Sequence, residues 1–160
     1  MTDNAFYHCL SEAQERIKAW RKDGKRIVFT NGCFDILHPG HVHYLTAAKE
    51  LGDALVIGLN DDDSVRRLDK GAGRPLNPLA DRACLLAALK PVDLVVPFSE
   101  DTPLELIEAL RPDVLVKGGD YEIEAIIGAR EVMSWGGHVT TIPFIAGHST
   151  TSLISRIQKD

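Results

Sequence analysis

The chain has 160 residues, of which 44% are hydrophobic and 26% are charged, and its formal net charge is −5. This profile is typical of one globular domain, and no apolar run approaches the ~18–20 residues that cross a bilayer. The negative charge disfavours a broad nucleic-acid surface, and residues 1–20 lack the basic-then-apolar order of a signal peptide. We therefore expect one cytoplasmic domain over residues 1–160, with no nucleic-acid partner and no membrane insertion.

Five short apolar runs recur along the chain, with amphipathic segments between them. This alternation is typical of an α/β protein with a parallel sheet. Three of the runs consist almost entirely of β-branched and leucine residues, as expected for strands that helices cover on both faces. In chain order the expected strands are 26–30, 54–59, 92–98, 113–118 and 138–144.

Helical segments fill the gaps, and several open with proline or with a capping serine or aspartate. A further helix over about 11–22 precedes the first strand, within an N-terminal extension of residues 1–24. The longest irregular segment, residues 70–77 (KGAGRPLN), is expected to be a working loop. The helices expected after the first strand are 39–51, 62–68, 78–89, 103–110, 123–135 and 149–157.

The first expected strand ends in residues 31–34 (NGCF), and a helix opens at Pro39. In open parallel sheets, ligands bind beyond the carboxyl ends of the strands. His38 and His41 are three residues apart at the start of this helix, so both imidazoles can face one anion, whereas His43 points elsewhere. With the free N–H groups of the helix N-terminus, the two histidines predict a phosphate site.

Two other interpretations of these histidines stay open. A zinc site is conceivable from H-x-x-H-x-H, but the spacing is not H-E-x-x-H, and no nearby cysteine or carboxylate completes a tetrahedron. Alternatively, His38 caps the helix and His41 is a partly buried polar residue, and for His43 this structural interpretation is preferred. The three cysteines lie far apart without a C-x-x-C pair, so reduced thiols and no protein-bound metal are expected.

The segment GCFDILHPGH (residues 32–41) resembles the G-x-F-D-x-x-H-x-G-H signature of the cytidylyltransferase-like nucleotidyltransferases. AGHSTTSLISRI (residues 146–157) is similar to the family's second signature, a Ser/Thr cluster that opens the last helix. The resemblance runs from about Lys25 to the C-terminus. It implies a Rossmann-like domain with strand order 3-2-1-4-5, and an enzyme that transfers a nucleotidyl group.

Three further segments resemble adenylyltransferases that make ADP-heptose from heptose 1-phosphate: RPLNPLADR (74–82), EDTPLELIEALRPDVLVKGGDY (100–121) and GHSTTSLISRI (147–157). This resemblance implies transfer of AMP from ATP to a sugar 1-phosphate, with release of pyrophosphate, on the route to lipopolysaccharide heptose. In some organisms the activity is fused behind a sugar-kinase domain. The present chain is expected to be the free-standing form.

A local basic run lies in this acidic protein, between the second and third expected strands. It comprises Arg66, Arg67, Lys70, Arg74 and Arg82. A flexible loop that carries lysine and arginine can close over phosphates. We expect Lys70 and Arg74, more than Arg66 and Arg67, to contact them. A solvated helix face followed by a surface loop is the alternative, because aspartates are interspersed.

Two more segments fall at strand ends. KGGDY (117–121) follows the fourth expected strand, and its glycines would admit a nucleotide against bare backbone, although a glycine turn capped by Asp120 is the alternative. HSTTS (148–152) would aim hydroxyl and amide groups at a phosphate, although simple capping by Ser149 stays open.

The expected site therefore has three groups of residues. The expected catalytic residues are His38, His41, Lys70 and Arg74. The expected nucleotide-binding residues are Thr30, Asn31, Gly32, Cys33, Phe34, Gly40, Lys117, Gly118, Gly119, Asp120, Ser149, Thr150 and Thr151. The expected acceptor-binding residues are Asp35, Asp62, Arg66 and Arg82.

Attack of one phosphate on another needs donors for the developing charge, and no unambiguous base accompanies the histidines. Magnesium is expected to arrive with ATP, because it keeps its waters and needs few protein ligands. The resemblance makes a homodimer a reasonable expectation. Two alternatives remain: a cytidylyltransferase for glycerol 3-phosphate or another small alcohol phosphate, and a nucleotide-binding regulator without turnover.

Overall fold

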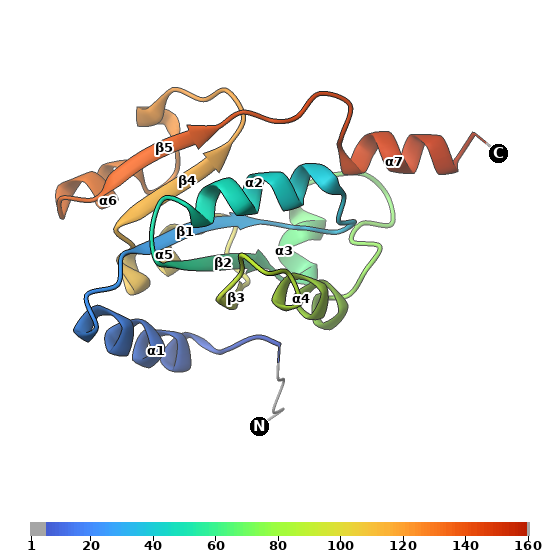
Figure 1. The fold of residues 1–160 in the computed structure, drawn as a ribbon. Helices are drawn as coiled ribbons and strands as arrows, with labels where there is room; N and C mark the ends of the chain where they lie inside the picture. Colours follow the sequence, from blue (N-terminus) through green and yellow to red (C-terminus); the bar gives the residue numbers. More distant parts are fainter. Residues whose placement is uncertain (1–5, 160) are drawn as a thin grey trace.

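Five parallel strands form one sheet in the order β3-β2-β1-β4-β5 (Figure 1), as expected from the resemblance. The computed structural model describes residues 6–159. All five expected strands are confirmed, with ends that differ by at most a few residues. Their bounds are β1 Ile27–Gly32, β2 Ala54–Asn60, β3 Leu94–Phe98, β4 Val114–Gly118 and β5 His138–Ile142.

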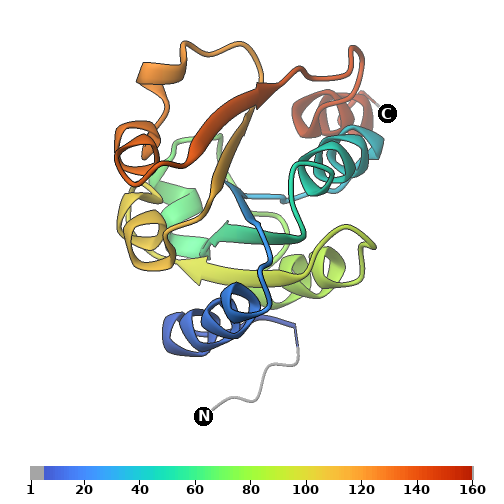
Figure 2. The same ribbon diagram turned by 60° about the vertical axis from the view of Figure 1, so that its left-hand side comes forward.

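Helices cover both faces of the sheet, because alternate strand side chains point to opposite faces. On one face, α1 (Leu10–Lys22), α5 (Leu104–Leu110) and α6 (Ala129–Ser134) pack on an apolar cluster around Phe29. On the other face, α2 (Pro39–Lys49) and α4 (Leu79–Ala87) pack on a cluster around Leu55. Figure 2 shows the two helical layers on either side of the sheet.

The expected N-terminal helix is confirmed as α1, whose Ala13 and Ile17 are buried against the sheet. The rest of the extension predicted for residues 1–24 includes residues 1–5, which lie outside the described part of the chain. The short helix α3 (Asp62–Arg67) follows β2 and begins where Asp61 accepts a hydrogen bond from the Ser64 N–H. Aspartate is a favoured residue at this capping position.

The single helix expected over 123–135 is wrong. A 3₁₀ turn, η1 (Ile123–Ala125), is followed by an interruption, and α6 begins only after Gly128. Gly128 has a φ of 86°, and a Cβ there would lie 2.7 Å from Ile107 Cδ1. Only glycine fits this left-handed position against the core. The break lets both Ile126 and Val132 bury their side chains.

Strands β1 and β4 diverge toward their carboxyl ends. β1 pairs with β2 along its whole length, from Ile27 to Gly32, but it pairs with β4 only through Val28 and Phe29. Within the sheet, β2 and β3 lie on one side of β1, and β4 and β5 lie on its other side. The switch point of the sheet, where α/β proteins bind ligands, therefore lies between β1 and β4.

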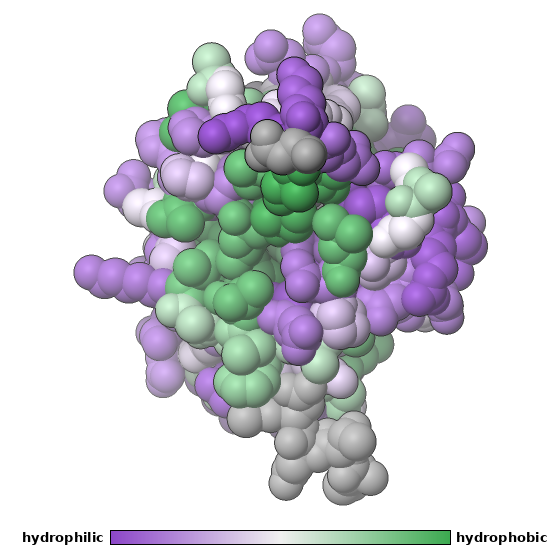
Figure 3. Space-filling model, turned by 90° about the vertical axis from the view of Figure 1, so that its right-hand side faces the viewer, coloured by the Kyte–Doolittle hydropathy of each residue, from purple (hydrophilic) through white to green (hydrophobic). Residues whose placement is uncertain are grey.

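The last helix, α7 (Thr150–Ile157), extends from the body of the molecule beyond the start of α2 (Figure 1). Ser149 caps it by accepting a hydrogen bond from the Ser152 N–H, and Thr150 Oγ1 donates to the Ile36 carbonyl. None of its residues is buried, and Ile157 is 70% exposed. Figure 3 views this end of the molecule and shows apolar surface in the middle of the face. No helix within residues 6–159 is long and apolar enough to span a membrane.

Candidate active site

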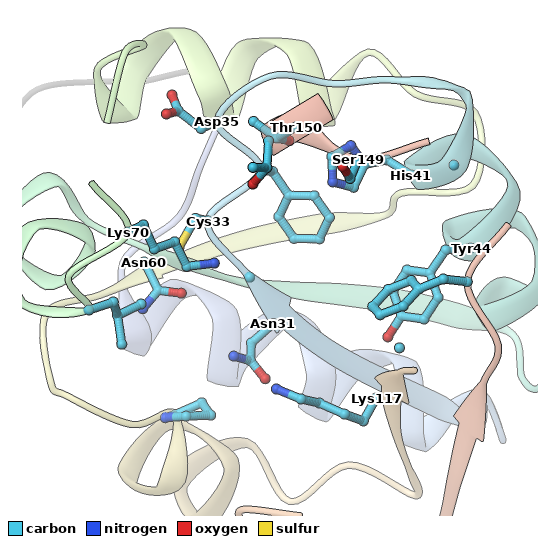
Figure 4. A pocket seen from close by; sticks show the side chains of 18 of the residues that line it. Asn31, Cys33, Asp35, His41, Tyr44, Asn60, Lys70, Lys117, Ser149 and Thr150 are labelled. Carbon is cyan, nitrogen blue, oxygen red and sulfur yellow. The ribbon is translucent and has the colours of Figure 1, made fainter. Parts of the chain in front are cut away.

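A cavity of about 720 Å³ opens at the switch point. Its walls come from the loop after β1, the N-terminal turn of α2, the end of β4, the loop after α3 and the start of α7. A volume of this size is typical of small-molecule sites. Figure 4 shows that the side chains of Asn31, Lys70 and Lys117 point into the same space from three different segments.

His38 and His41 stack on one another at the start of α2. His38 is the residue before the helix, with an extended backbone, and Pro39 supplies the first helical residue. The ring centroids are 3.8 Å apart and the ring planes differ by 26°. The backbone N–H of His38 donates to Nδ1 of His41, at 3.3 Å. Because that nitrogen accepts, neutral His41 carries its proton on Nε2, which becomes a donor.

Both imidazoles are disfavoured as cations in the ligand-free protein. Burial lowers the pKa of His41 to about 4, and the nearby His38 and Lys70 act in the same direction. Burial also lowers the pKa of His38, and the neighbouring His148 adds to that effect. The two rings are therefore neutral hydrogen-bond donors near pH 7.

Two lysines supply the positive charge of the cavity. Lys70 lies in the loop after α3, and Lys117 lies near the end of β4. Burial lowers the pKa of Lys117, and Lys70 lowers it further. Within residues 6–159 neither ammonium group has an ion pair or a hydrogen bond, although Lys117 Nζ lies 5.4 Å from the ring centroid of Tyr121. Both lysines are thus available to an anion.

Asp35 is fully engaged by the protein, although the cavity reaches it. Its carboxylate accepts from Arg74 Nε at 2.6 Å and from the N–H groups of Leu76 and Asn77, each at 2.9 Å. Burial acts to raise the pKa of Asp35, but these hydrogen bonds outweigh burial, and its pKa lies below the usual value. Asp35 therefore anchors the loop that presents Arg74, and its predicted role in acceptor binding stays a prediction.

Four residues predicted for the site do not line the cavity, because other groups in the protein hold them. They are Thr30, Asp62, Arg66 and Arg82. Arg82 is 0% exposed; it donates to the carbonyls of Cys33, Asn60 and Asn77, and it pairs with Asp62 at 2.6 Å. Arg66 pairs with Asp63 on the surface. Thr30 is buried, with its hydroxyl 2.6 Å from that of Tyr44.

The sequence predicted open backbone at Gly118, the last residue of β4, and at Gly119, but the structure shows both covered. A Cβ at Gly118 or Gly119 would lie 2.8 Å from the ring of Phe144, which covers both residues. Gly118 lines the cavity, together with Phe144, whereas Gly119 and the exposed Asp120 do not. A nucleotide at this wall would therefore meet an aromatic ring.

The other predicted residues do line the cavity. They are Asn31, Gly32, Cys33, Phe34, Gly40, Ser149, Thr150 and Thr151. Ser149 serves at the same time as the cap of α7, so its two interpretations are compatible. Burial raises the pKa of the Cys33 thiol, which favours its neutral form.

Sequence reasoning missed several residues of the cavity. Asn60 ends β2, Thr102 and Pro103 follow β3, Phe144 follows β5, and His148 precedes the cap of α7. All of them lie at or beyond the carboxyl end of a strand, which is the signal that would have identified them. His148 was visible within the HSTTS segment, but only the hydroxyl residues were assigned a role.

No group of three or more His, Cys, Asp or Glu side chains that could hold a metal ion occurs in residues 6–159. The zinc interpretation of the histidines therefore finds no third ligand in this part of the chain. The two carboxylates that line the cavity, Asp35 and Asp101, are paired with Arg74 and Arg67. These donors do not fit a magnesium site held by the protein itself.

A family model described as "Cytidylyltransferase-like" matches residues 29–156. The chain belongs to this family. The match spans β1 to α7 and so includes every wall of the cavity. The stacked His38 and His41, the Ser/Thr cluster at α7 and the strand order thus occur together in a member of the cytidylyltransferase-like family.

Two curated relatives share the name "Bifunctional protein HldE". The chain is 59% identical over 146 residues to the protein of Acidiphilium cryptum and 57% identical over 150 residues to that of Methylococcus capsulatus. These matches cover 91% and 93% of the chain but only 30% and 32% of the relatives, so the chain spans about a third of their length.

A solved structure, the lipopolysaccharide core biosynthesis protein from Thermoplasma volcanium, is also similar. It matches with a TM-score of 0.63 and 31% identity, over 76% of this chain and 98% of the other. The similarity at this level of identity supports shared ancestry as well as a shared fold.

Proposed function

We propose that this protein transfers AMP from ATP to a heptose 1-phosphate, giving ADP-heptose and pyrophosphate for lipopolysaccharide synthesis. The observation that carries the proposal is a cavity with many hydrogen-bond donors and, among the described residues that line it, no unpaired carboxylate. His38, His41, Lys70 and Lys117 line it, while both of its carboxylates are already paired. Transfer between phosphates builds negative charge on the α-phosphate and on pyrophosphate, so donors are what the reaction needs.

In the proposed step, an oxygen of the acceptor phosphate forms a bond to the α-phosphorus. The bond from that phosphorus to the bridging oxygen of the β-phosphate breaks, and its electron pair leaves with pyrophosphate. A phosphate monoester has a second pKa of about 6, so the acceptor is largely ionised at neutral pH. No enzyme group has to remove a proton from it.

We assign each donor according to its position. His41 presents Nε2–H toward the α-phosphate, and the backbone N–H of His38 fixes that tautomer. Lys70 and Arg74 stabilise charge on the departing pyrophosphate; Arg74 is held by Asp35 through Nε, which leaves its terminal nitrogens for a ligand. Lys117, across the cavity, stabilises the acceptor phosphate.

Magnesium enters this proposal as part of the substrate. A triphosphate carries the ion, which keeps several of its waters and needs few protein ligands. Because Asp35 and Asp101 are both paired, we route no step through an ion held by the protein.

The identity of the acceptor rests on the relatives. The Thermoplasma structure is titled a lipopolysaccharide core biosynthesis protein, and the HldE proteins are named bifunctional. A chain that matches about a third of such proteins is consistent with one of two activities. The resemblance of residues 74–82 and 100–121 to adenylyltransferases that make ADP-heptose favours nucleotidyl transfer as that activity.

A second candidate is a cytidylyltransferase that acts on glycerol 3-phosphate, which the name of the matching family favours. A matrix of ATP and CTP against heptose 1-phosphate, glycerol 3-phosphate and ethanolamine phosphate, with pyrophosphate release as the readout, tests both. Fastest turnover with ATP and heptose 1-phosphate is expected. Faster turnover with CTP and glycerol 3-phosphate would establish the second candidate, and no turnover with any pair would favour a nucleotide-binding regulator.

The proposed reaction uses ATP and a sugar phosphate, both of which are cytoplasmic metabolites, so we infer a cytoplasmic enzyme. The homodimer expected from the resemblance stays a prediction. Sedimentation or light scattering at several protein concentrations measures it directly.

A further inference from the structure

The cavity receives polar side chains from both faces of the sheet. Asn31 follows Phe29 by two positions in β1, and Lys117 follows Leu115 by two positions in β4. Phe29 and Leu115 belong to the apolar cluster on the face that α5 and α6 cover. Since alternate side chains of a strand point to opposite faces, Asn31 and Lys117 extend to that same face.

Asn60, the last residue of β2, also extends to the α5 face. Val56 belongs to the same apolar cluster, and Asn60 lies four positions after it in the strand. In the register of the sheet, Asn31 lies opposite Gly58, two positions before Asn60. Because β4, β1 and β2 are neighbours, their ends present Lys117, Asn31 and Asn60 to the cavity as a row (Figure 4).

The groups that we assign to ATP lie on the other face. His41 belongs to α2, which packs on the opposite side of the sheet. Thr150, at the start of α7, donates a hydrogen bond to a carbonyl of the loop that leads into α2. A Cβ at Gly118 would lie 2.8 Å from Phe144 and 3.3 Å from Tyr44 of α2, so the aromatic wall is on this side too. ATP on the α2 side leaves the α5 side for the acceptor.

The amide of Asn60 is held in one orientation. Its Nδ2 donates to Ser64 Oγ at 2.8 Å, and that hydroxyl in turn donates to the Glu100 carbonyl at 3.2 Å. Because its proton is used, the Ser64 hydroxyl can only accept from the amide. The side-chain carbonyl oxygen of Asn60 therefore points away from Ser64. This oxygen has no partner within residues 6–159 and is not sealed from solvent, although the residue as a whole is only 4% exposed.

The second amide, that of Asn31, makes no side-chain hydrogen bond to the described part of the chain, and it lines the same cavity. An amide presents N–H donors and a carbonyl acceptor, and a sugar hydroxyl likewise both donates and accepts. An ionised phosphate only accepts, so a carbonyl oxygen that opens onto the cavity does not suit it. The two amides are matched instead to hydroxyl groups.

We propose that Asn31 and Asn60 bind hydroxyl groups of the acceptor and so select a polyhydroxylated phosphate, such as a sugar phosphate. This inference rests on the proposed function and deepens it, because it gives the sugar of the acceptor a place on the α5 side of the cavity. Lys117, at the end of the same row, then meets the phosphate of that acceptor. Asn31, which the sequence assigned to the nucleotide, becomes a residue that determines acceptor specificity.

Isothermal titration of heptose 1-phosphate into the full chain, saturated with α,β-methylene-ATP and magnesium, tests the inference. The methylene group replaces the bridging oxygen whose bond would break, so binding is measured without transfer. Asn31→Ala should bind heptose 1-phosphate about threefold to tenfold more weakly than the wild type, because a neutral hydrogen bond is lost. Its affinity for α,β-methylene-ATP and its stability in urea should be unchanged, since this amide makes no hydrogen bond within residues 6–159.

Asn60→Ala should weaken acceptor binding by a similar factor, but it also removes the internal hydrogen bond to Ser64. Ser64→Ala removes that bond and keeps the Asn60 amide, so it should lose less acceptor affinity than Asn60→Ala. Ser99→Ala is the matched control, because Ser99 is exposed after β3 and does not line the cavity. It should bind both ligands as the wild type does.

A series of monodeoxy heptose 1-phosphates tests for direct contact. The wild type should lose affinity for at least one analogue, and Asn31→Ala should show no further loss for that analogue, since residue and hydroxyl act as one pair. Equal affinity for heptose 1-phosphate in the wild type, Asn31→Ala and Asn60→Ala would overturn the inference. Weakened binding of α,β-methylene-ATP alone, or additive losses for every analogue, would overturn it as well.

Failure of the proposed function gives a different result. Absence of turnover, with these binding results intact, would reject the proposed transfer and leave the inference standing. If the wild type does not bind heptose 1-phosphate, the proposed acceptor is rejected, and the same titrations with glycerol 3-phosphate, a smaller polyol phosphate, decide the inference. Binding of neither compound would overturn it.

Discussion

Two regions of the chain carry most of the charged and polar residues that the sequence assigned to the site, and they behave differently. Residues 31–41 deliver their predicted side chains into the cavity or to its wall, with Asp35 turned to anchor a loop. Of the basic run over residues 66–82, only Lys70 and Arg74 reach it. A strand end that runs into a helix N-terminus fixes where its side chains lie, whereas a basic loop does not.

Partners from elsewhere in the fold explain the difference. Arg82 is held by carbonyls at the ends of β1 and β2 and by Asp62, and Arg67 pairs with Asp101 after β3. None of these partners is close in sequence, so the spacing of the arginines gave no indication of them. A cluster of basic residues in the sequence therefore indicates only the region of a site. The carbonyl and carboxylate groups that the fold brings close to these residues determine which of them remain free to bind a ligand.

The largest effect is expected for Arg82→Ala. This change would remove the arginine donor from three carbonyls, two of them buried, and leave Asp62 without its partner, at a cost of about 3–5 kcal/mol of unfolding free energy. Urea unfolding followed by circular dichroism measures it. Arg66→Ala, which removes only a surface pair, should stay within about 0.5 kcal/mol. Equal stability of the two variants would remove the structural role given to Arg82.

The next effect concerns catalysis in the first region. His41→Ala should lower kcat by at least ~100-fold with little change in fold or nucleotide binding, because its donor matters most as charge develops on the α-phosphate. Steady-state kinetics with pyrophosphate release measures this. His43→Ala is the control on the same helix and should be nearly silent. Similar losses at both positions would contradict the assignment of His41.

A smaller kinetic effect should distinguish Lys70 from Arg66, both of which belong to the basic run over residues 66–82. Lys70→Ala should reduce kcat/KM by about tenfold or more, since it removes a cation with no other partner in the described chain. Arg66→Ala should leave kcat/KM within about twofold, because Arg66 pairs with Asp63 on the surface. An equal loss of activity in the two variants would contradict this expectation. It would show that the basic run acts through its overall charge and not through side chains placed in the cavity.

The fold could be predicted from the sequence because its signals are local and periodic. Alternating apolar runs located all five strands, and the family signature supplied their order. The break at Gly128 was missed, because the reason for it, contact with Ile107, comes from another helix. Phe144 over Gly118 and His148 beside His38 were missed for the same reason: each pair is brought together only by the folded sheet.

The smallest effect is expected from Asp35→Asn, as a change in the pH dependence of stability. The pKa of Asp35 is lower in the folded protein than its usual value, so its stabilising contribution is present above about pH 4 and is lost as the pH falls through the lowered folded pKa. The variant should therefore be less stable than the wild type at pH 7, and the difference should shrink in acid. A stability difference that does not change with pH would show that the carboxylate charge is not what anchors residues 74–77.

The central claim is that the described part of the site supplies hydrogen-bond donors and no unpaired carboxylate, so that the acceptor phosphate reacts in its own ionised form. The most direct test is the rising limb of the pH–rate profile, measured with the ordinary acceptor and with one whose phosphate pKa is lowered by fluorination beside the ester oxygen. Under conditions where chemistry limits the rate, we predict that the limb moves with the acceptor and persists in Asp35→Asn and Asp120→Asn. A limb that stays fixed and disappears in one of these variants would establish an enzymatic general base and contradict the account.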